Sequence, residues 1–244
     1  MSYEEFYTWQ EDVPGFGEAA QEKLRNCTAL VSRVGGLGGP LAFSLAAAGV
    51  GRIILAHGGE LRPDDLNRQI LMTHDGLGEL RHEQAAETLR RFNPELEIES
   101  VGENISEENA ADLVGKADLV FSCAPLFEER LLMNREAMRQ GKFFVDGAMC
   151  SMEGHVLAVR PGESACLGCL VKEPPAYWKR RFPVIGAVSA MVAQIAALEG
   201  IKLVTGFAEP ALDHLIHVDT IALRMKKVKL LRDPDCPHCS NPGS

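Results

Sequence analysis

Apolar residues along this chain form short continuous runs that alternate with segments in which they recur every three or four positions. The runs predict buried strands, and the periodic segments predict helices. The expected strands are 28–32, 52–56, 96–101, 118–123 and 143–146, and the expected helices are 18–26, 41–48, 82–91, 107–114 and 128–139. Strands that alternate with helices in this way predict a doubly wound, Rossmann-like α/β fold with a mostly parallel sheet.

The pattern changes near residue 150. Segments 154–160, 214–218 and 222–229 are predicted to form antiparallel strands, and a long apolar helix is expected at 184–204. A loop rich in proline and aromatic residues, 172–183, precedes this helix. We therefore expect the parallel sheet to continue into antiparallel strands.

Composition and charge narrow the function classes. A hydrophobic content of 46% and a charged content of 24% are ordinary for a globular protein. The formal net charge of −9 argues against nonspecific binding to nucleic acid or to a membrane. The acidic N-terminus does not resemble a signal peptide, and the apolar run 187–198 is too short to span a membrane. We expect a cytoplasmic protein.

Four of the seven cysteines form two C-x-x-C pairs, Cys166 with Cys169 and Cys236 with Cys239. Two such pairs supply a tetrahedral sulfur site for zinc, and four sulfur ligands leave no open position for catalysis. A pair of redox dithiols is the alternative, although neither pair is expected to open a helix directly after a strand. We expect a structural zinc ion in residues 151–244, which form one domain with a nucleotide-binding-type half, residues 1–150.

A glycine-rich turn occupies residues 33–40, between the first predicted strand and the helix 41–48. The glycines alone are a weak signal. Their place between a strand and a helix makes them a candidate for binding phosphate, because the first N–H groups of a helix attract anions.

Further motifs follow this turn in a fixed order. They are Gly-Gly-Leu-Gly-Gly-Pro at 35–40, Ala-Ala-Ala-Gly-Val-Gly at 46–51, Leu-Asn-Arg-Gln-Ile-Leu at 66–71, Arg-Phe-Asn-Pro at 91–94, Met-Glu-Gly at 152–154 and Arg-Asp-Pro-Asp-Cys-Pro-His-Cys at 232–239. With the cysteine pair at 166–169, they make the chain resemble the ThiF/MoeB/HesA family, relatives of ubiquitin-activating enzymes, from about residue 17 to residue 240.

The resemblance implies an activity and a set of site residues. Members bind Mg-ATP at the first strand-to-helix turn, adenylate the terminal glycine of a small ubiquitin-like sulfur carrier, and act as dimers. The resemblance also implies a dimer, either of two identical chains or with a related chain. The implied substrate is a carrier protein or another molecule that carries a carboxylate. The residues expected at the nucleotide are Arg33, Gly35, Gly36, Gly38, His57, Asn67, Arg68, Gln69, Arg81, Arg130 and Asn134, with Arg68 and Arg81 as catalytic cations. For Arg68, an ion pair with Asp64 or Asp65 is the alternative.

The chain departs from the family pattern at four positions. Arg33 stands where the first glycine of the phosphate turn is expected, and it either blocks the nucleotide or donates to a phosphate. His57 replaces the acid that holds the ribose, and Pro125 replaces the aspartate that binds magnesium. Trp9 replaces an arginine that reaches across the dimer.

The segment 172–183 contains no cysteine, so thioester transfer through this loop is not expected. Its basic run Lys179-Arg180-Arg181, among aromatic residues, is a candidate for docking a partner, with packing on the domain as the alternative. Cys123 and Cys150 lie near the expected ends of strands and are either site thiols or core residues.

Two functions therefore remain open. One is an ATP-dependent adenylyltransferase, and the other is a degenerate protein of the same fold that holds a carrier or pairs with an active relative. A dinucleotide-dependent redox enzyme is disfavoured by Arg33 and His57.

Overall fold

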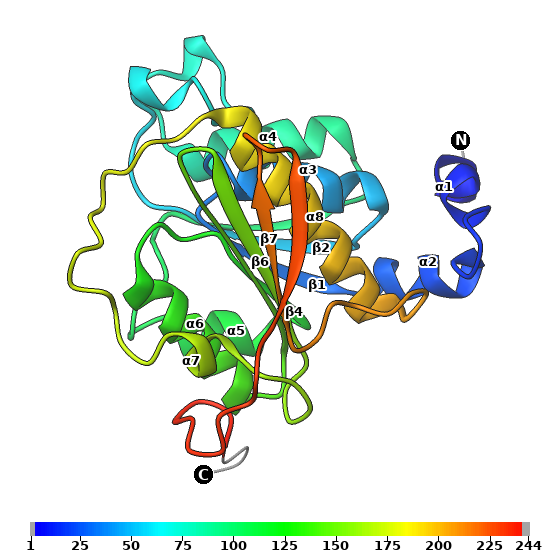
Figure 1. Cartoon of the computed structure of the whole chain (residues 1–244). Helices are drawn as coiled ribbons and strands as arrows, with labels where there is room; N and C mark the ends of the chain where they lie inside the picture. Colours follow the sequence, from blue (N-terminus) through cyan, green and yellow to red (C-terminus); the bar gives the residue numbers. More distant parts are fainter. Residues whose placement is uncertain (1–2, 241–244) are drawn as a thin grey trace.

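A computed structural model describes residues 3–240 (Figure 1). One sheet of eight strands forms its centre, in the order β3-β2-β1-β4-β5-β6-β7-β8. The strands are β1 (Thr28–Ser32), β2 (Arg52–Ala56), β3 (Glu97–Val101), β4 (Leu119–Ser122), β5 (Phe143–Cys150), β6 (Glu153–Val159), β7 (His214–Asp219) and β8 (Arg224–Lys229). The first five strands pair with one another in parallel, and β6, β7 and β8 add antiparallel pairs. The predicted fold class is confirmed.

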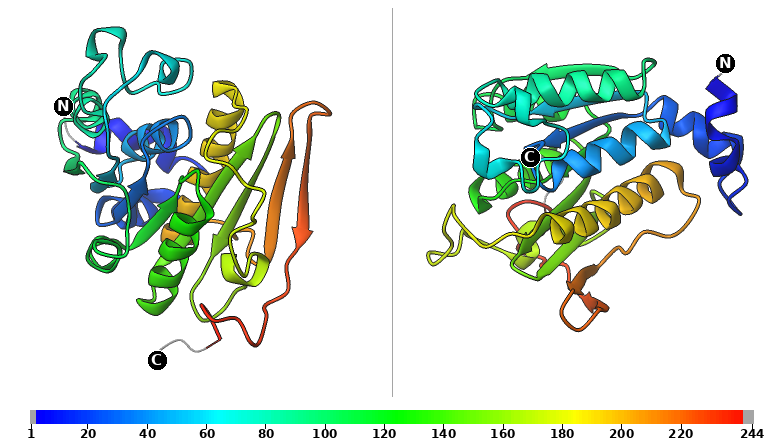
Figure 2. Two further views of the ribbon diagram at one scale, coloured as in Figure 1. Left: turned by 90° about the vertical axis from the view of Figure 1, so that its left-hand side faces the viewer. Right: turned by 90° about the horizontal axis from the view of Figure 1, so that it is seen from above.

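Helices lie on both faces of this sheet (Figure 2). They are α1 (Tyr3–Glu11), α2 (Gly17–Arg25), α3 (Gly38–Ala48), α4 (Arg81–Phe92), α5 (Ala110–Gly115), α6 (Phe127–Arg139), α7 (Leu167–Leu170) and α8 (Gly186–Thr205), with the 3-10 helices η1 (Pro63–Asp65) and η2 (His74–Gly76). Successive strand residues point to opposite faces, so Ile53 packs in one hydrophobic cluster and Ile54 in the other. Two cores therefore sandwich the sheet.

Some elements differ from the sequence prediction. Strand β5 continues to Cys150 because it forms a hairpin with β6. Helix α5 begins at Ala110 rather than at residue 107, since the Asn109 side chain accepts a hydrogen bond from the Ser106 backbone N–H and closes a turn first. Helices α1 and α7 were not predicted, and both are short.

Helix α8 packs unusually close to the sheet. A Cβ atom at Gly200 would lie 2.3 Å from the Phe121 ring, and one at Gly154 would lie 2.3 Å from Val192 Cγ2. With 20 residues, α8 is longer than the apolar run 187–198 and is long and apolar enough to cross a membrane. Half of its apolar window is buried against the domain, as in the core helix of a globular protein.

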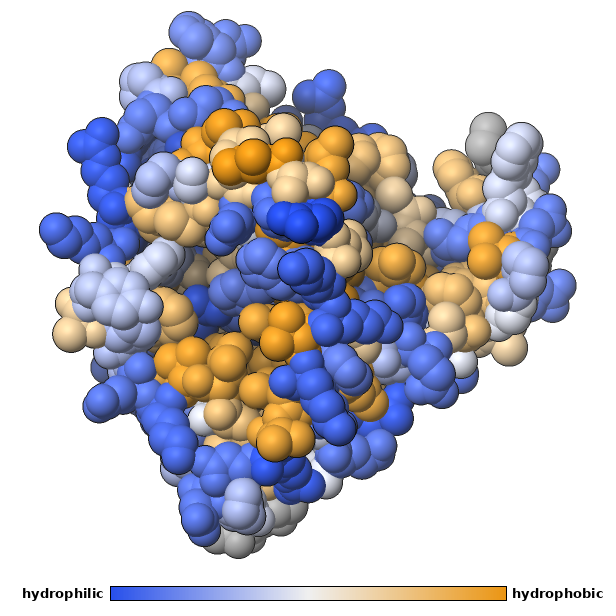
Figure 3. All heavy atoms as spheres, viewed as in Figure 1, coloured by the Kyte–Doolittle hydropathy of each residue, from blue (hydrophilic) through white to orange (hydrophobic). Residues whose placement is uncertain are grey.

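The two ends of the described chain lie on opposite sides of the molecule (Figure 1). Helices α1 and α2 extend from one side of the sheet, and α1 exposes 92% of Trp9. All six residues of β8, at the outer edge, are exposed, and four of them are Lys or Arg. Such charge discourages further strands from pairing at this edge. Figure 3, in the same view as Figure 1, shows hydrophilic side chains over much of the visible surface, with hydrophobic patches between them.

Candidate functional site

A cavity opens at the carboxyl ends of the parallel strands. Strand β1 lies between β2 and β4. The connection after β1 runs to one side and the connection after β4 runs to the other, so a crevice forms between them. The cavity is lined by the glycine turn after β1, by His57 after β2, by residues 123–125 after β4 and by residues 147–149 of β5. Trp178 and Phe182, from the loop before α8, complete the wall.

The sequence-predicted residues distribute unevenly around this cavity. Its lining includes Arg33, Gly35, Gly36, His57, Arg68, Gln69 and Arg130, and does not include Gly38, Asn67, Arg81 or Asn134. The turn itself is tight. A Cβ at Gly38 would lie 2.5 Å from the Arg33 carbonyl oxygen, and one at Gly36 would lie 3.0 Å from the Arg68 side chain. These glycines therefore let the turn and the start of helix α3 pack close to strand β1 and to Arg68.

Arg33 has a left-handed backbone, with φ 58°. Its guanidinium pairs with Glu129 on the first turn of α6, with Nε 2.9 Å and Nη2 2.6 Å from Oε2. The two side chains are 15% and 6% exposed. The sequence analysis missed Glu129, because an acidic residue in the first turn of a helix is an ordinary feature.

Arg68 and Arg81 share one buried carboxylate, Asp65. Arg81 Nη2 lies 2.6 Å from Asp65 Oδ2, and Arg68 Nη2 lies 3.2 Å from Oδ1. Burial alone would raise the pKa of Asp65, but the hydrogen bond from Arg81 and the two arginine charges lower it. Asp65 therefore holds both guanidinium groups in place.

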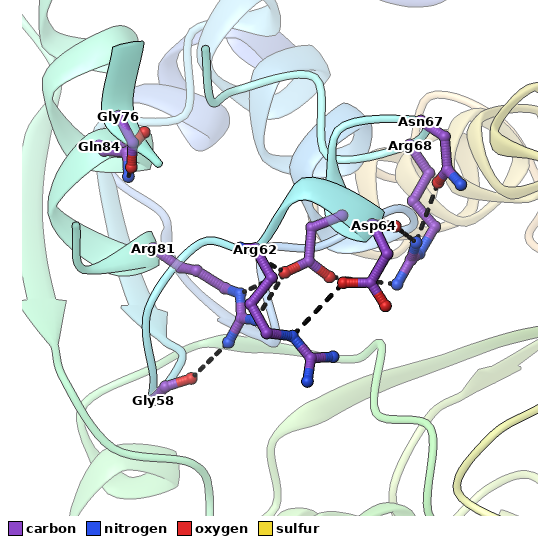
Figure 4. Close-up of polar contacts among 9 residues, drawn as sticks. Gly58, Arg62, Asp64, Asn67, Arg68, Gly76, Arg81 and Gln84 are labelled. Carbon is purple, nitrogen blue, oxygen red and sulfur yellow. Dashed lines mark hydrogen bonds and ion pairs between the residues drawn. The ribbon is translucent and has the colours of Figure 1, made fainter. Parts of the chain in front are cut away.

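Figure 4 shows further contacts around these arginines. Arg68 Nη1 donates to the Asp64 carbonyl oxygen at 2.6 Å and to Asn67 Oδ1 at 2.9 Å. Arg81 Nη1 donates to the Gly58 carbonyl oxygen at 3.2 Å. The ion pair expected as the alternative role of Arg68 is present with Asp65, and Arg68 still lines the cavity.

His57 and Gln69 carry buried polar atoms at the cavity. Their side chains are 6% and 5% exposed, and His57 Nδ1 and Gln69 Oε1 have no hydrogen-bond partner among the described residues. Burial, followed by the charges of Arg81 and Arg33, lowers the pKa of His57 to about 3. His57 is therefore a neutral imidazole at ordinary pH, and both atoms lack the hydrogen-bond partner that buried polar atoms usually have.

Arg130 lies beneath the cavity in a buried network. It pairs with Asp146 through two contacts, of 2.9 Å and 2.6 Å, and its guanidinium carbon lies 4.4 Å from the centroid of the Phe127 ring. His155 Nε2 lies 3.0 Å from Arg130 Nη2. Arginine only donates, so this nitrogen accepts and His155 is neutral; burial and Arg130 lower the pKa of His155 to about 4.

The loop before α8 is anchored by Trp178. Its Nε1 donates to the Pro125 carbonyl oxygen at 2.7 Å, and its rings contact Phe127 and Phe182. This contact brings Arg180 to the cavity. Burial lowers the pKa of Arg180, and so do the charges of Arg33, Arg68, Arg62 and Arg81. From the sequence, Arg180 belonged to a candidate run for docking a partner, with packing of the loop on the domain as the alternative, and Arg62 was not singled out.

The thiols and the N-terminal tryptophan play different parts. Cys123 lines the cavity, where burial raises the pKa of its thiol well above the usual value, with Asp146 and Glu129 raising it further. Cys123 is therefore a poor nucleophile. Cys150 and Trp9 do not contribute to the cavity lining.

The four cysteines of the C-x-x-C pairs come together near the C-terminus, and their sulfur atoms all lie within 4.8 Å of one another. Cys166 Sγ is 3.6 Å from Cys236 Sγ, and Cys169 Sγ is 3.5 Å from Cys239 Sγ. Zinc–sulfur bonds of about 2.3 Å in a tetrahedron require sulfur separations of about 3.8 Å. The cluster therefore fits a zinc ion with four sulfur ligands.

Asn134, expected at the nucleotide, lies at this cluster instead. Its Nδ2 lies 3.5 Å from Cys166 Sγ and 2.8 Å from His238 Nδ1, and its Oδ1 accepts from the Leu167 N–H at 3.0 Å. Arg130 and Asn134 are one turn apart on α6. This helix therefore connects the cavity with the cysteine cluster.

Comparison with known proteins agrees with this architecture. The ThiF family profile matches residues 7–238. The chain belongs to the ThiF family. It is 46% identical over 237 residues to protein HesA of Leptolyngbya boryana, which covers 97% of this chain and 86% of that protein. It is 31% identical over 244 residues to the sulfur carrier protein adenylyltransferase of Thermus thermophilus, which covers 96% of this chain and 90% of that protein.

A solved structure shares the ThiF-family fold. The crystal structure of E. coli MccB with ATP superposes with a TM-score of 0.81 at 22% identity, covering 91% of this chain and 69% of that chain. At this identity the likeness establishes the fold. The residues at the cavity of the present chain then decide its chemistry.

Proposed function

We propose that this protein is an adenylyltransferase that activates the terminal carboxylate of a small ubiquitin-like carrier protein. The observation that carries the proposal is the cavity at the sheet's switch point, where the glycine turn meets Arg33, Arg68 and Arg180. This arrangement suits the phosphate chain of a nucleotide. The sulfur carrier adenylyltransferase among the relatives supports the choice of reaction.

In this reaction a carboxylate oxygen of the carrier attacks the α-phosphorus of ATP. The bond from that phosphorus to the oxygen that bridges to the β-phosphate breaks, and pyrophosphate leaves. The products are an acyl-adenylate and pyrophosphate. The protein contributes position and charge, and both depend on groups that are already held in place before the ligand arrives.

The ion pairs described above provide that preorganisation. Asp65 holds the guanidinium groups of Arg68 and Arg81, and Glu129 holds Arg33. The 172–183 loop contains no cysteine. The acyl-adenylate would therefore not be converted into a thioester on this loop. Another carboxylate-bearing peptide or small molecule is an alternative acceptor.

A specific observation favours a second candidate, a binding protein without turnover. The Arg33–Glu129 pair places a buried carboxylate beside the phosphate turn, and Pro125 offers no carboxylate to a metal. A protein with these features would hold a carrier or pair with an active relative.

Carrier-dependent exchange of labelled pyrophosphate into ATP separates the two candidates. The assay uses a panel of purified ubiquitin-like sulfur carriers, each with a matched form that lacks its terminal glycine. Exchange with the intact form alone is expected for the enzyme. Carrier binding by calorimetry without any exchange would support the second candidate and reject the first.

Two arginine variants test the role of the cavity in this assay. Arg68→Ala is expected to lower exchange by about a hundredfold, since one preorganised charge contributes about 10²–10³ in rate. Arg224→Ala is the matched control, because Arg224 lies on the exposed edge strand β8 and not in the cavity lining. Equal losses in both variants would argue against a specific role for Arg68.

We also propose a zinc ion at Cys166, Cys169, Cys236 and Cys239 with a structural role. Four sulfur ligands fill the tetrahedral shell and leave no position for a substrate. A dimer, of two copies or with a related chain, is proposed from the family resemblance and from the prevalence of two-fold symmetry. Seven cysteines outside disulfides favour the cytoplasm.

A further inference from the structure

The cavity contains arginines and no acidic residue. Among the described residues that line it, four are arginines, Arg33, Arg68, Arg130 and Arg180, and none is Asp or Glu. Magnesium is bound in proteins by one or two carboxylates together with substrate phosphates. The lining therefore offers it no first ligand.

The buried carboxylates just outside the lining are already engaged. Glu129 is bound by Arg33 through contacts of 3.1, 2.9 and 2.6 Å. Asp65 lies between Arg68 and Arg81, and Asp146 is paired with Arg130. A metal that displaced an arginine from one of these carboxylates would break a buried ion pair, which costs about 3–5 kcal/mol.

Position 125 offers no side-chain ligand, and its carbonyl oxygen already accepts a hydrogen bond. Proline has no side-chain oxygen, and its carbonyl oxygen accepts the Trp178 Nε1 hydrogen bond at 2.7 Å. The magnesium ion implied by the family therefore does not fit the residues of this site.

The same region carries an excess of positive charge. Arg33, Arg62, Arg68, Arg81 and Arg180 bring five positive charges, while Glu129, Asp64 and Asp65 bring three negative ones, which leaves a surplus of two. An anion in the cavity would neutralise this surplus. Arginine suits phosphate oxygens because its planar fork binds two of them at once.

The uncharged end of the ligand is indicated by His57 and Gln69. Both side chains are more than nine-tenths buried, both residues line the cavity, and each has one buried atom without a hydrogen-bond partner among the described residues. A neutral imidazole and an amide match hydroxyl groups, which both donate and accept. The combination of an anionic end and hydroxyls is that of a nucleotide.

We propose that the cavity binds the phosphate chain of a nucleoside triphosphate directly through its arginines, without a divalent cation. The proposal rests on the proposed function only for the choice of a nucleotide as the ligand. It predicts that magnesium does not improve binding, because complexation reduces the ligand's negative charge.

Calorimetry on the full-length, zinc-loaded protein tests this. ATP and, separately, inorganic pyrophosphate are titrated in metal-depleted buffer with and without magnesium chloride; a strong chelator is avoided because it would remove the zinc. Binding without magnesium that is as tight as, or tighter than, binding with it is expected. Affinity that rises about tenfold or more on adding magnesium would overturn the proposal.

Two neighbouring arginines provide a matched pair of variants. Arg180→Ala is expected to weaken metal-free ATP binding by about tenfold, the loss of one charge-assisted contact. Arg181→Ala, outside the cavity lining, is expected to leave it within about twofold. Thermal melting of both variants shows whether each is folded, and equal affinities in two folded variants would count against the arginine site.

The outcomes also separate this inference from the proposed function. Metal-free binding without pyrophosphate exchange keeps the inference and rejects the enzyme. Magnesium-dependent binding with exchange keeps the enzyme and rejects the inference. Absence of ATP binding under both conditions rejects both.

Discussion

At residue 33 the backbone and the side chain have opposite preferences. Its φ of 58° lies in the left-handed region, where a residue other than glycine costs about 1–2 kcal/mol. The side chain compensates by neutralising Glu129, which is only 6% exposed. Arg33 is therefore coupled to a residue 96 positions away in the sequence.

This coupling predicts the effect of Arg33→Gly. The glycine relieves the backbone but leaves Glu129 buried and unpaired beside the phosphate turn. We expect the free energy of unfolding to fall by about 2–4 kcal/mol and pyrophosphate affinity to fall at least about tenfold. Urea unfolding and calorimetry measure the two effects.

The double variant Arg33→Gly with Glu129→Gln is the control. Because it removes both charges, it should recover most of the lost stability. If Arg33→Gly alone kept its stability and bound ATP more tightly, Arg33 would block the nucleotide, as one of the two sequence interpretations held.

His57 predicts a pH dependence of stability. Its pKa is about 3 in the folded protein, and an unfolded histidine has a pKa of about 6.5. Below pH 6.5 the unfolded chain gains a proton that the folded chain does not, so stability falls as the pH decreases toward 3. The slope is at most about 1.4 kcal/mol per pH unit for this residue.

Denaturant unfolding between about pH 6 and pH 5 checks this sign, in a range chosen to limit the contribution of carboxylates. His155, whose pKa is lowered to about 4, adds a slope of the same sign. Burial also lowers the pKa of His238, so the variant His57→Gln should lose roughly a third to a half of the wild-type slope. An unchanged slope would show that His57 is not kept neutral by the fold.

Among the elements, the loop before α8 has the clearest single anchor. The Trp178 Nε1 bond to the Pro125 carbonyl joins this loop to the end of β4, and Arg180 follows two residues later. The sequence indicated a basic, aromatic loop. Its contact with the cavity depends on the pairing of two segments 53 residues apart.

We expect Trp178→Phe to loosen this loop. The change keeps an aromatic ring for Phe127 and Phe182 but removes the N–H donor. Proteolysis within 172–183 should become faster, and nucleotide affinity should fall about three- to tenfold, the effect of about 1 kcal/mol. Tyr177→Phe, at an 81% exposed neighbour, is the control and should change neither. Proteolysis at the wild-type rate would show that the bond does not hold the loop.

At the scale of the whole molecule, the cysteine cluster connects the centre of the chain to its end. The sulfur pairs Cys166–Cys236 and Cys169–Cys239 are each separated by 70 residues. Between them lie α8, β7 and β8. A metal at the cluster would therefore hold the C-terminal half together.

Removal of zinc is expected to destabilise this half strongly. Structural zinc contributes about 10–16 kcal/mol in small zinc domains, which exceeds the stability of many proteins. Cys236→Ser or a strong chelator should lower the melting temperature and increase hydrogen exchange in β7 and β8. Metal analysis of the untreated protein should find one zinc per chain.

Cys150→Ala serves as the control, because Cys150 is not part of the cluster. It should retain the zinc and nearly the wild-type melting temperature. If chelation changed neither metal content nor melting temperature, the zinc assignment would be wrong.

Local patterns were enough to predict the framework of this protein. Hydrophobic periodicity indicated the strands and most helices, because strands and helices bury their apolar residues with different repeats. The glycine turn and the two C-x-x-C pairs indicated the position of a ligand crevice and a cysteine cluster, since the spacing of these residues is itself a local geometric constraint. The order of the motifs also indicated the ThiF family, which the comparison shows.

Tertiary structure decided which charges meet. Arg33 with Glu129, Arg81 with Asp65 and Asn134 with the cysteine cluster are contacts between segments distant in the sequence, and no local pattern encodes them. The same holds for the unpartnered atoms of His57 and Gln69, because burial depends on what the rest of the chain places around them. The sequence alone thus determined the fold and its crevice, while the charge and the available hydrogen-bonding groups of that crevice were set by folding.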